Sequence, residues 1–153
     1  MQARSKVFSL IYTMTLLFST MLTTQAQEKQ KQGVWDGKTH VVYHLSDPNQ
    51  VNLALQNISF HLKGMGDAEL MDIVLVVQGQ ALLAFHKKDA FENIQRGVAA
   101  LIGKGVDVRA CANTMAMQGI TLDDLFDDLQ VAERGAVIEV TNLQSDGYIY
   151  IRP

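Results

Sequence analysis

The stretch from Met71 to Val77 reads MDIVLVV and decides the class of fold. Apart from Asp72, it is a continuous apolar run rich in β-branched residues, which favour strands. Such a run suits a strand that is buried on both faces, as in the centre of a parallel sheet. Gln78 and Gly79 end the run. The stretch therefore predicts a central strand with covering helices on both sides of its sheet.

Other predicted strands lie on both sides of this one along the chain. Residues 40–45 (HVVYHL) are rich in β-branched and aromatic residues, which favour a strand. Residues 106–110 (VDVRA) form the next expected strand, which delivers Cys111 at its end. Two further apolar segments, 136–140 and 148–151, are expected to complete a sheet of about five strands.

Between these strands, apolar residues recur at helical spacing. The first predicted helix follows the capping residues Ser46 and Asp47, starts near Pro48 and runs to about Lys63. The second is expected to have Asp89 as its cap, with Glu92 three residues on as in a capping box. Thr121 is expected to cap a third. The predicted core stripes of the three helices are, in order, Val51, Leu55, Ile58 and Leu62; Phe91, Ile94, Val98, Leu101 and Ile102; and Leu122, Leu125, Phe126 and Leu129.

Shorter elements complete the prediction. Residues 81–85 are apolar and suit a helical turn under a loop, 113–119 a loop or short helix, and 142–144 a turn or short helix. The elements then alternate as strand, helix, strand, helix, strand, helix, strand, strand. Alternation of this kind predicts an α/β domain of three layers, α/β/α, with a mostly parallel sheet.

The N-terminal residues have the pattern of a cleavable signal peptide. Arg4 and Lys6 precede a mostly apolar segment, and Thr24-Gln25-Ala26 has small residues at the positions a signal peptidase requires. The alternative, an uncleaved anchor, needs a longer and more apolar span of about 20 residues. We therefore expect residues 1–26 to be removed, 27–37 to be a polar, disordered leader and 38–153 to form the domain, in a periplasmic protein without a stable membrane anchor.

The charge balance restricts the partners. The predicted signal peptide holds two of the 13 Lys and Arg residues and none of the 16 Asp and Glu residues. The remaining chain thus has eleven basic and 16 acidic residues, a net charge of −5. A mildly acidic protein is not expected to bind nucleic acid, whose phosphates require a basic patch.

Cys111 is the sharpest candidate for chemistry. Sites in open α/β sheets form beyond the carboxyl ends of the strands, where the sequence places His44, Gly79 and Cys111. Asn113 or Thr114 is expected to cap a helix that starts just after Cys111, and a helix N-terminus favours a thiolate. A thiolate can accept sulfur as a persulfide or attack a disulfide. The alternative is an inert cysteine that packs as a small hydrophobic residue. Since the chain has one cysteine, an intrachain disulfide is impossible.

Other candidate sites are weaker. Cys111, Met115 and Met117 offer the soft sulfur ligands that select Cu(I), although methionines more often fill gaps in a core. His44 and His86 could border a cleft near the thiol as acid or base. The acidic residues at 123, 124, 127 and 128 suit the solvated face of a helix better than a metal site. No phosphate loop, zinc-type cysteine pattern or Ser/His/Asp signature occurs, so we expect no cofactor.

Three stretches carry a resemblance to a known family. They are Gly105-Val-Asp-Val-Arg-Ala-Cys-Ala-Asn-Thr114, then Gly119-Ile-Thr121 followed by an acidic, leucine-bearing segment and Gly135, and the ending Gln144-Ser-Asp-Gly-Tyr-Ile-Tyr-Ile-Arg-Pro153. Together they resemble the exported branch of the DsrE/DsrF-like family. The likeness covers nearly the whole chain from about Lys38.

The resemblance implies a three-layer α/β domain that commonly forms oligomers. It also implies that Cys111 matches a family cysteine that carries sulfur as a persulfide in the sulfur-oxidation and sulfur-relay members. We therefore expect a periplasmic sulfur carrier more than a turnover enzyme, with a donor or acceptor protein or a small thiol as partner. The alternative is a non-catalytic oligomeric binding module, with Cu(I) as one candidate ligand. Leu53 and Phe60, nearly opposite the core stripe of their helix, are the expected homo-oligomer contact.

Overall fold

The structure is a computed structural model that describes residues 37–66 and 68–153. The predicted signal peptide and all but the last residue of the predicted leader lie outside these residues. The described chain contains a five-stranded sheet in the order β4-β3-β2-β1-β5, and all its strand pairs are parallel. The strands are β1 (Thr39–Leu45), β2 (Met71–Val77), β3 (Asp107–Cys111), β4 (Gln130–Ala132) and β5 (Ile149–Ile151). The run MDIVLVV is the central strand, as predicted.

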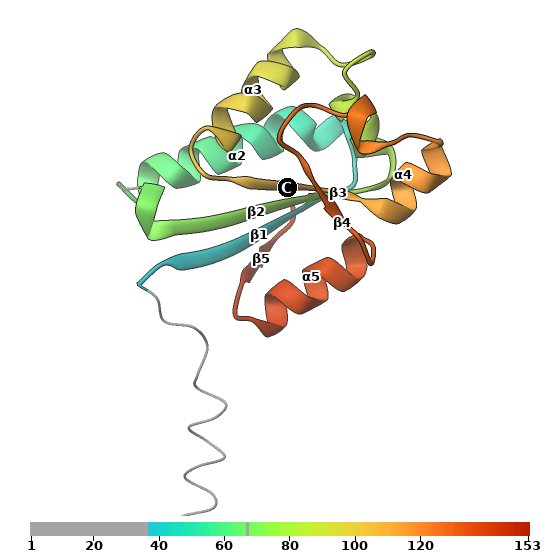
Figure 1. Cartoon of the computed structure of the whole chain (residues 1–153). Helices are drawn as coiled ribbons and strands as arrows, with labels where there is room; N and C mark the ends of the chain where they lie inside the picture. The colour runs from blue at the N-terminus through green and yellow to red at the C-terminus, as the bar shows by residue number, and fades with distance from the viewer. Residues whose placement is uncertain (1–36, 67) are drawn as a thin grey trace, which may run out of the picture. The chain divides into compact units, whose positions relative to one another are not determined.

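Helices cover both faces of the sheet, which confirms the three-layer prediction. In Figure 1, α2 (Val51–Gly64) and α3 (Glu92–Ile102) lie on one face, and α5 (Ala136–Ser145) lies on the other. The short helix α4 (Ala112–Gln118) starts directly where β3 ends. Within the described part of the chain, four 3₁₀ segments also form: η1 (Pro48–Gln50), η2 (Ala68–Leu70), η3 (Gly79–Phe85) and η4 (Leu122–Asp124).

The alternation of side chains along each strand divides the core into two apolar clusters. Val41, Ile73 and Val108 pack with α2 and α3, whereas Val42, Val74 and Cys111 pack with α5. Successive strand residues point to opposite faces, so neighbours in sequence enter different clusters. Cys111 therefore belongs to the α5 side of the sheet.

The predicted helix over 122–129 is wrong. Only one 3₁₀ turn forms there. Thr121 caps it, as expected: its N–H donates to Asp124 Oδ2 at 2.8 Å and its hydroxyl contacts the same oxygen at 2.9 Å. Leu125 is already extended, and the N–H of Phe126 donates to Phe85 O at 3.0 Å instead of to a helical partner. Leu125, Phe126 and Leu129 are buried as expected, in an irregular segment that leads into β4, whereas Leu122 is 39% exposed.

The predicted strand over 136–140 is also wrong, because these residues begin α5. Gly135, at φ +89°, turns the chain out of β4 and is the N-cap of the helix. The buried residues Ala136, Val140 and Leu143 follow helical spacing. A short stretch of β-branched residues is compatible with a strand or a helix. The fourth strand is instead Gln130–Ala132.

The predicted start of the second helix needs one correction. Its N-cap is Phe91 and not Asp89, and the Phe91 side chain is 77% exposed instead of joining the core stripe. The N–H of Asp89 donates to His86 O in a turn before the helix. In the described residues, none of the helices has the length and apolar character needed to span a membrane.

Candidate functional site

Cys111 lies where β3 ends and α4 begins. It is the last residue of β3 and the N-cap of α4, with an extended backbone at φ −69° and ψ 117°. The expectation that Asn113 or Thr114 caps this helix is therefore wrong, since both lie inside its first turn. The expected position of the thiol, at a strand end and a helix start, is nevertheless present.

A pocket of about 360 Å³ opens next to the thiol at the carboxyl end of the sheet. It collects Gly79 from the start of η3, just after β2, Cys111 from β3, and Asn113 and Thr114 from α4, so that segments far apart in the sequence share one site. Cys111 itself is only 3% exposed. The remaining lining residues come from four segments: Ser46 after β1, Gln78 after β2, Met117 on α4, and the turn and first residues of α5, namely Arg134, Gly135, Ala136, Val137 and Ile138.

Hydrogen bonds around Cys111 favour its thiolate. Burial raises the pKa of the Cys111 thiol, but hydrogen bonds to the Thr114 hydroxyl and to the backbone N–H groups of Ala136, Thr114 and Asn113 lower it, and the net pKa is lowered. The Ala136 N–H lies 3.3 Å from Sγ. Donors aimed at a sulfur atom stabilise its charged form more than its neutral form. The expected lowering of the pKa thus has a physical basis in two converging helix starts.

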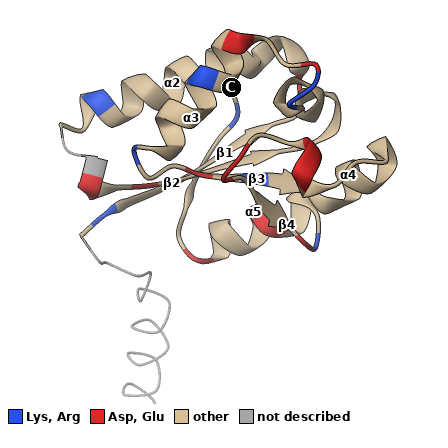
Figure 2. Ribbon diagram, turned by 45° about the horizontal axis from the view of Figure 1, so that its top comes forward, with Lys and Arg blue, Asp and Glu red and all other residues tan. Residues whose placement is uncertain are grey.

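The Gly79 and Thr114 side of the pocket is held together by hydrogen bonds. The Gly79 N–H donates to Thr114 Oγ1 at 3.0 Å, and the Gln118 side-chain amide donates to Gly79 O at 3.1 Å. Gln118 Oε1 in turn lies 3.2 Å from Nε2 of the buried His86. His86 thus contacts α4 through Gln118 and does not line the pocket. Figure 2 shows α4 without any Lys, Arg, Asp or Glu.

His44 does not join this pocket. Two strand positions separate β1 from β3, and His44 Nδ1 lies 3.1 Å from Tyr150 OH on the other side of β1. Burial, and then the positive charge of Arg152, lower the pKa of His44. Its Nε2 atom is buried and has no hydrogen-bond partner among the described residues. His44 therefore belongs to a separate polar position near the edge strand β5.

The proposed copper ligands do not converge. Met115 is buried in the apolar cluster on the α2 and α3 side, whereas Cys111 lies in the cluster on the α5 side. Met117 is 86% exposed at the pocket rim. Within residues 37–66 and 68–153, no group of three or more His, Cys, Asp or Glu side chains is placed to hold a metal ion.

Sequence reasoning missed the contribution of α5, because its first residues had been assigned to a strand. Gly135 lies against Asn113 so closely that a Cβ atom on it would be 2.4 Å from Asn113 Nδ2. This contact packs the start of α5 against α4. Arg134 adds a positive charge to the same rim. The sequence signal that could have revealed this site is Gly135 followed by apolar residues at positions 136, 140 and 143.

Comparison with known proteins gives one family and two similar structures. The model of the DsrE/DsrF-like family matches residues 40–153. A protein of unknown function from Methanobacterium thermoautotrophicum, MTH1491, is 26% identical over 76% of this chain and 100% of its own, with a TM-score of 0.67. The E. coli protein YchN is 16% identical over 75% of this chain and 100% of its own, with a TM-score of 0.57, and shows the fold alone. No curated protein sequence matches.

Proposed function

Because this chain belongs to the DsrE/DsrF-like family, we propose that it is a sulfur carrier that holds a persulfide on Cys111. The observation that carries the proposal is the surroundings of the thiol. Its Sγ atom receives hydrogen bonds from the starts of two helices and borders a pocket of about 360 Å³. These contacts favour the thiolate, which is the form that attacks sulfur.

The proposed transfer needs no external oxidant or reductant. The Cys111 thiolate attacks the outer sulfur of a donor persulfide, R–S–SH. A new S–S bond forms at Cys111, the S–S bond of the donor breaks, and the donor leaves with the electron pair as the thiolate R–S⁻. Cys111 then holds the group –S–SH, and the reverse reaction passes this sulfur to an acceptor thiol.

The surroundings of the pocket suit the charge of the carried sulfur. The terminal sulfur of a persulfide is readily ionised, and Arg134 and the N–H groups at the start of α5 offer positive potential near it. Met117, Val137 and Ile138 add apolar side chains to the pocket rim, and Cys111, only 3% exposed, is itself shielded from water. Protection of this kind favours a carrier, whose bound sulfur must persist until an acceptor arrives.

The proposal places the protein in the periplasm after removal of residues 1–26. Its partner is a donor or acceptor protein, or a small thiol, that presents one sulfur atom at the pocket. The family is related to sulfur metabolism, and the resemblance described above supports this partner class. A homo-oligomer is part of the same proposal.

Intact mass spectrometry tests the sulfur-carrier function. The exported form is incubated with cysteine persulfide and freed from small molecules. We expect a gain of one sulfur atom on Cys111 that is lost on reduction with dithiothreitol. Cys111→Ser is the matched control and should gain nothing. A folded wild-type protein that never gains sulfur from the persulfide would overturn the proposal.

A further inference from the structure

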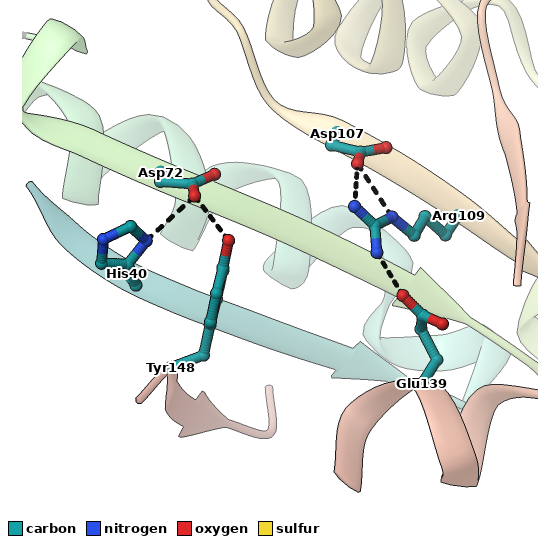
Figure 3. A network of polar contacts seen from close by, with 6 residues as sticks. All are labelled: His40, Asp72, Asp107, Arg109, Glu139 and Tyr148. Atoms are coloured by element: carbon teal, nitrogen blue, oxygen red, sulfur yellow. Dashed lines mark hydrogen bonds and ion pairs between the residues drawn. The ribbon is translucent and has the colours of Figure 1, made fainter. Parts of the chain in front are cut away.

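A network of charged side chains links β3 to the first turn of α5. Arg109 donates from Nε to Asp107 Oδ2 at 2.8 Å on its own strand, and its guanidinium also contacts Glu139 on α5. Figure 3 shows the Arg109 side chain reaching from the strand to the helix. All three side chains are largely buried, with 20–24% of each exposed. Asp107 orients the Arg109 guanidinium through two of its nitrogens, and the remaining contact with Glu139 links this strand position to the helix.

The same helix turn donates a hydrogen bond to the thiol. Glu139 N–H donates to Gly135 O at 3.1 Å, which closes the first turn of α5, and Ala136 N–H in that turn donates to Cys111 Sγ at 3.3 Å. Arg109 and Cys111 are two residues apart on β3 and so share one face of the sheet. The ion pair and the thiol contact thus connect the same strand to the same helical turn.

We propose that Arg109 and Glu139 are positioning residues that hold the start of α5 against Cys111 Sγ and thereby set the reactivity of the thiol. This inference rests on the sulfur-carrier function proposed for the same cysteine. The two side chains act on the thiol through the helix, because they hold in place the turn that carries the Ala136 N–H.

The charged groups around Cys111 support action through position. On its face of the sheet, Asp107, Arg109 and Glu139 together carry a net charge of −1, so loss of the Glu139 charge alone would lower the pKa of Cys111, and a rise would report position. β2 and β4 place Val74, Val76, Gln130 and Ala132 on this face, with Asp72 at the start of β2. His44 lies two strands away, α4 has no charge, and Arg134 is at the rim. The hydrogen bonds, and no charged side chain, counteract burial in lowering the pKa of Cys111.

A second polar contact offers a matched control at the other end of α5. The Tyr148 hydroxyl, just after this helix, donates to Asp72 Oδ2 on β2, and His40 Nδ1 lies 2.9 Å from the same oxygen. Figure 3 shows this group beside the Arg109 network and separate from it. Tyr148→Phe removes a polar link between the helix end and the sheet without touching the turn that contacts Cys111. A loss of general stability alone would therefore appear in this variant too.

The test measures the thiol pKa by nuclear magnetic resonance of the exported form labelled with ¹³Cβ-cysteine. The chain has one cysteine, so one signal reports its titration. We expect Glu139→Ala to raise the pKa so that the thiolate fraction at neutral pH falls about threefold to tenfold. Glu139→Gln, which keeps an acceptor for Arg109, should give a smaller shift and is the more conservative variant for folding. Tyr148→Phe should leave the titration unchanged.

Two outcomes would overturn the inference. One is a Glu139→Ala or Glu139→Gln titration that superimposes on that of the wild type. The other is an equal shift in Tyr148→Phe, which would indicate general loosening of the helix. The test is independent of sulfur transfer. If the titration shifts but Cys111 never gains sulfur, the positioning role holds and the carrier function fails. If Cys111 gains sulfur but the titration does not shift, the carrier function holds and the positioning role fails.

Discussion

The backbone N–H of Gly79 donates a 3.0 Å hydrogen bond to the hydroxyl oxygen of Thr114, a residue on a different element. Because the Thr114 oxygen accepts this bond, its own proton is free to be donated elsewhere, and Cys111 Sγ is the partner that the hydroxyl reaches. Gly79 adopts φ +58°, which few other residues tolerate. The end of β2 thus orients the hydroxyl that stabilises the thiolate at the end of β3.

This relationship predicts the effect of removing the hydroxyl. Thr114→Val has nearly the same shape but cannot donate to the thiolate, so the pKa of Cys111 should rise and alkylation at neutral pH should slow by about tenfold. Thr114→Ser keeps the hydroxyl and should react close to the wild-type rate. The measurement is the rate of reaction with iodoacetamide, a small reagent, across a pH series. Equal rates for Val and Ser variants would contradict the assigned role.

A second prediction concerns Gly135. Gly135→Ala meets two costs, because φ +89° strains an L-residue and the added Cβ would lie 2.4 Å from Asn113 Nδ2. Gly147→Ala is the matched control, since its φ is +96° and no other atom lies within 4 Å of the added Cβ. Strain alone should cost about 1–3 kcal/mol of the free energy of unfolding, and Gly135→Ala should cost more. Denaturant unfolding of both variants checks this difference, which should shrink when Asn113→Ala is added.

A third prediction concerns acid stability and His44. Burial, then Arg152, lower the pKa of His44 below its unfolded value of about 6.5. The folded state therefore binds fewer protons than the unfolded state, and the stabilising contribution is present above about pH 6.5 and is lost as the pH falls through the folded pKa. The wild-type Tm should fall with acidification more steeply than that of His44→Phe. Tyr150→Phe removes the hydrogen-bond partner but keeps the titrating ring, so its slope should stay steep.

A fourth prediction concerns assembly. Leu53 and Phe60 on α2 are 44% and 64% exposed, which agrees with their expected position outside the core. A homo-oligomer that uses this face should dissociate when both become Asp, and multi-angle light scattering measures the mass. Val137→Asp, which adds a charge to an exposed position of α5 on the opposite face of the sheet, should leave the mass unchanged. If the double variant keeps the wild-type mass, this face is not the contact.

A fifth prediction concerns export. After expression with its own N-terminus in a Gram-negative host, the protein should be recovered from the periplasm with Gln27 as its first residue, as N-terminal sequencing would show. Ala26→Arg should block cleavage at this site, because a signal peptidase requires a small residue there. Full-length wild-type chain in the membrane fraction would contradict the prediction.

Local sequence determined the sheet and the place of the thiol. The run Met71–Val77 is apolar on both faces of a strand, so both faces must be buried, and it forms the central strand. The strand that ends at Cys111 was predicted to within a residue. Gly79 and His44 were expected near the thiol because parallel strands end at one edge of a sheet, and Gly79 lines its pocket whereas His44 does not. Asn113 and Thr114, expected at the start of the next helix, also line the pocket.

Tertiary structure decided the rest. The residues after Thr121 have helical spacing, yet only one 3₁₀ turn forms, Leu125 is extended, and the N–H of Phe126 donates to Phe85 O in η3. Residues 136–140 suit a strand, yet they form a helix because Gly135 turns the chain and the buried stripe packs on the sheet. The intrinsic preference of a short segment for helix or strand is too weak to decide its conformation, so long-range packing decides it. The sequence alone thus determined that Cys111 stands at a strand end, whereas only the packing of α5 decided which N–H group contacts its sulfur.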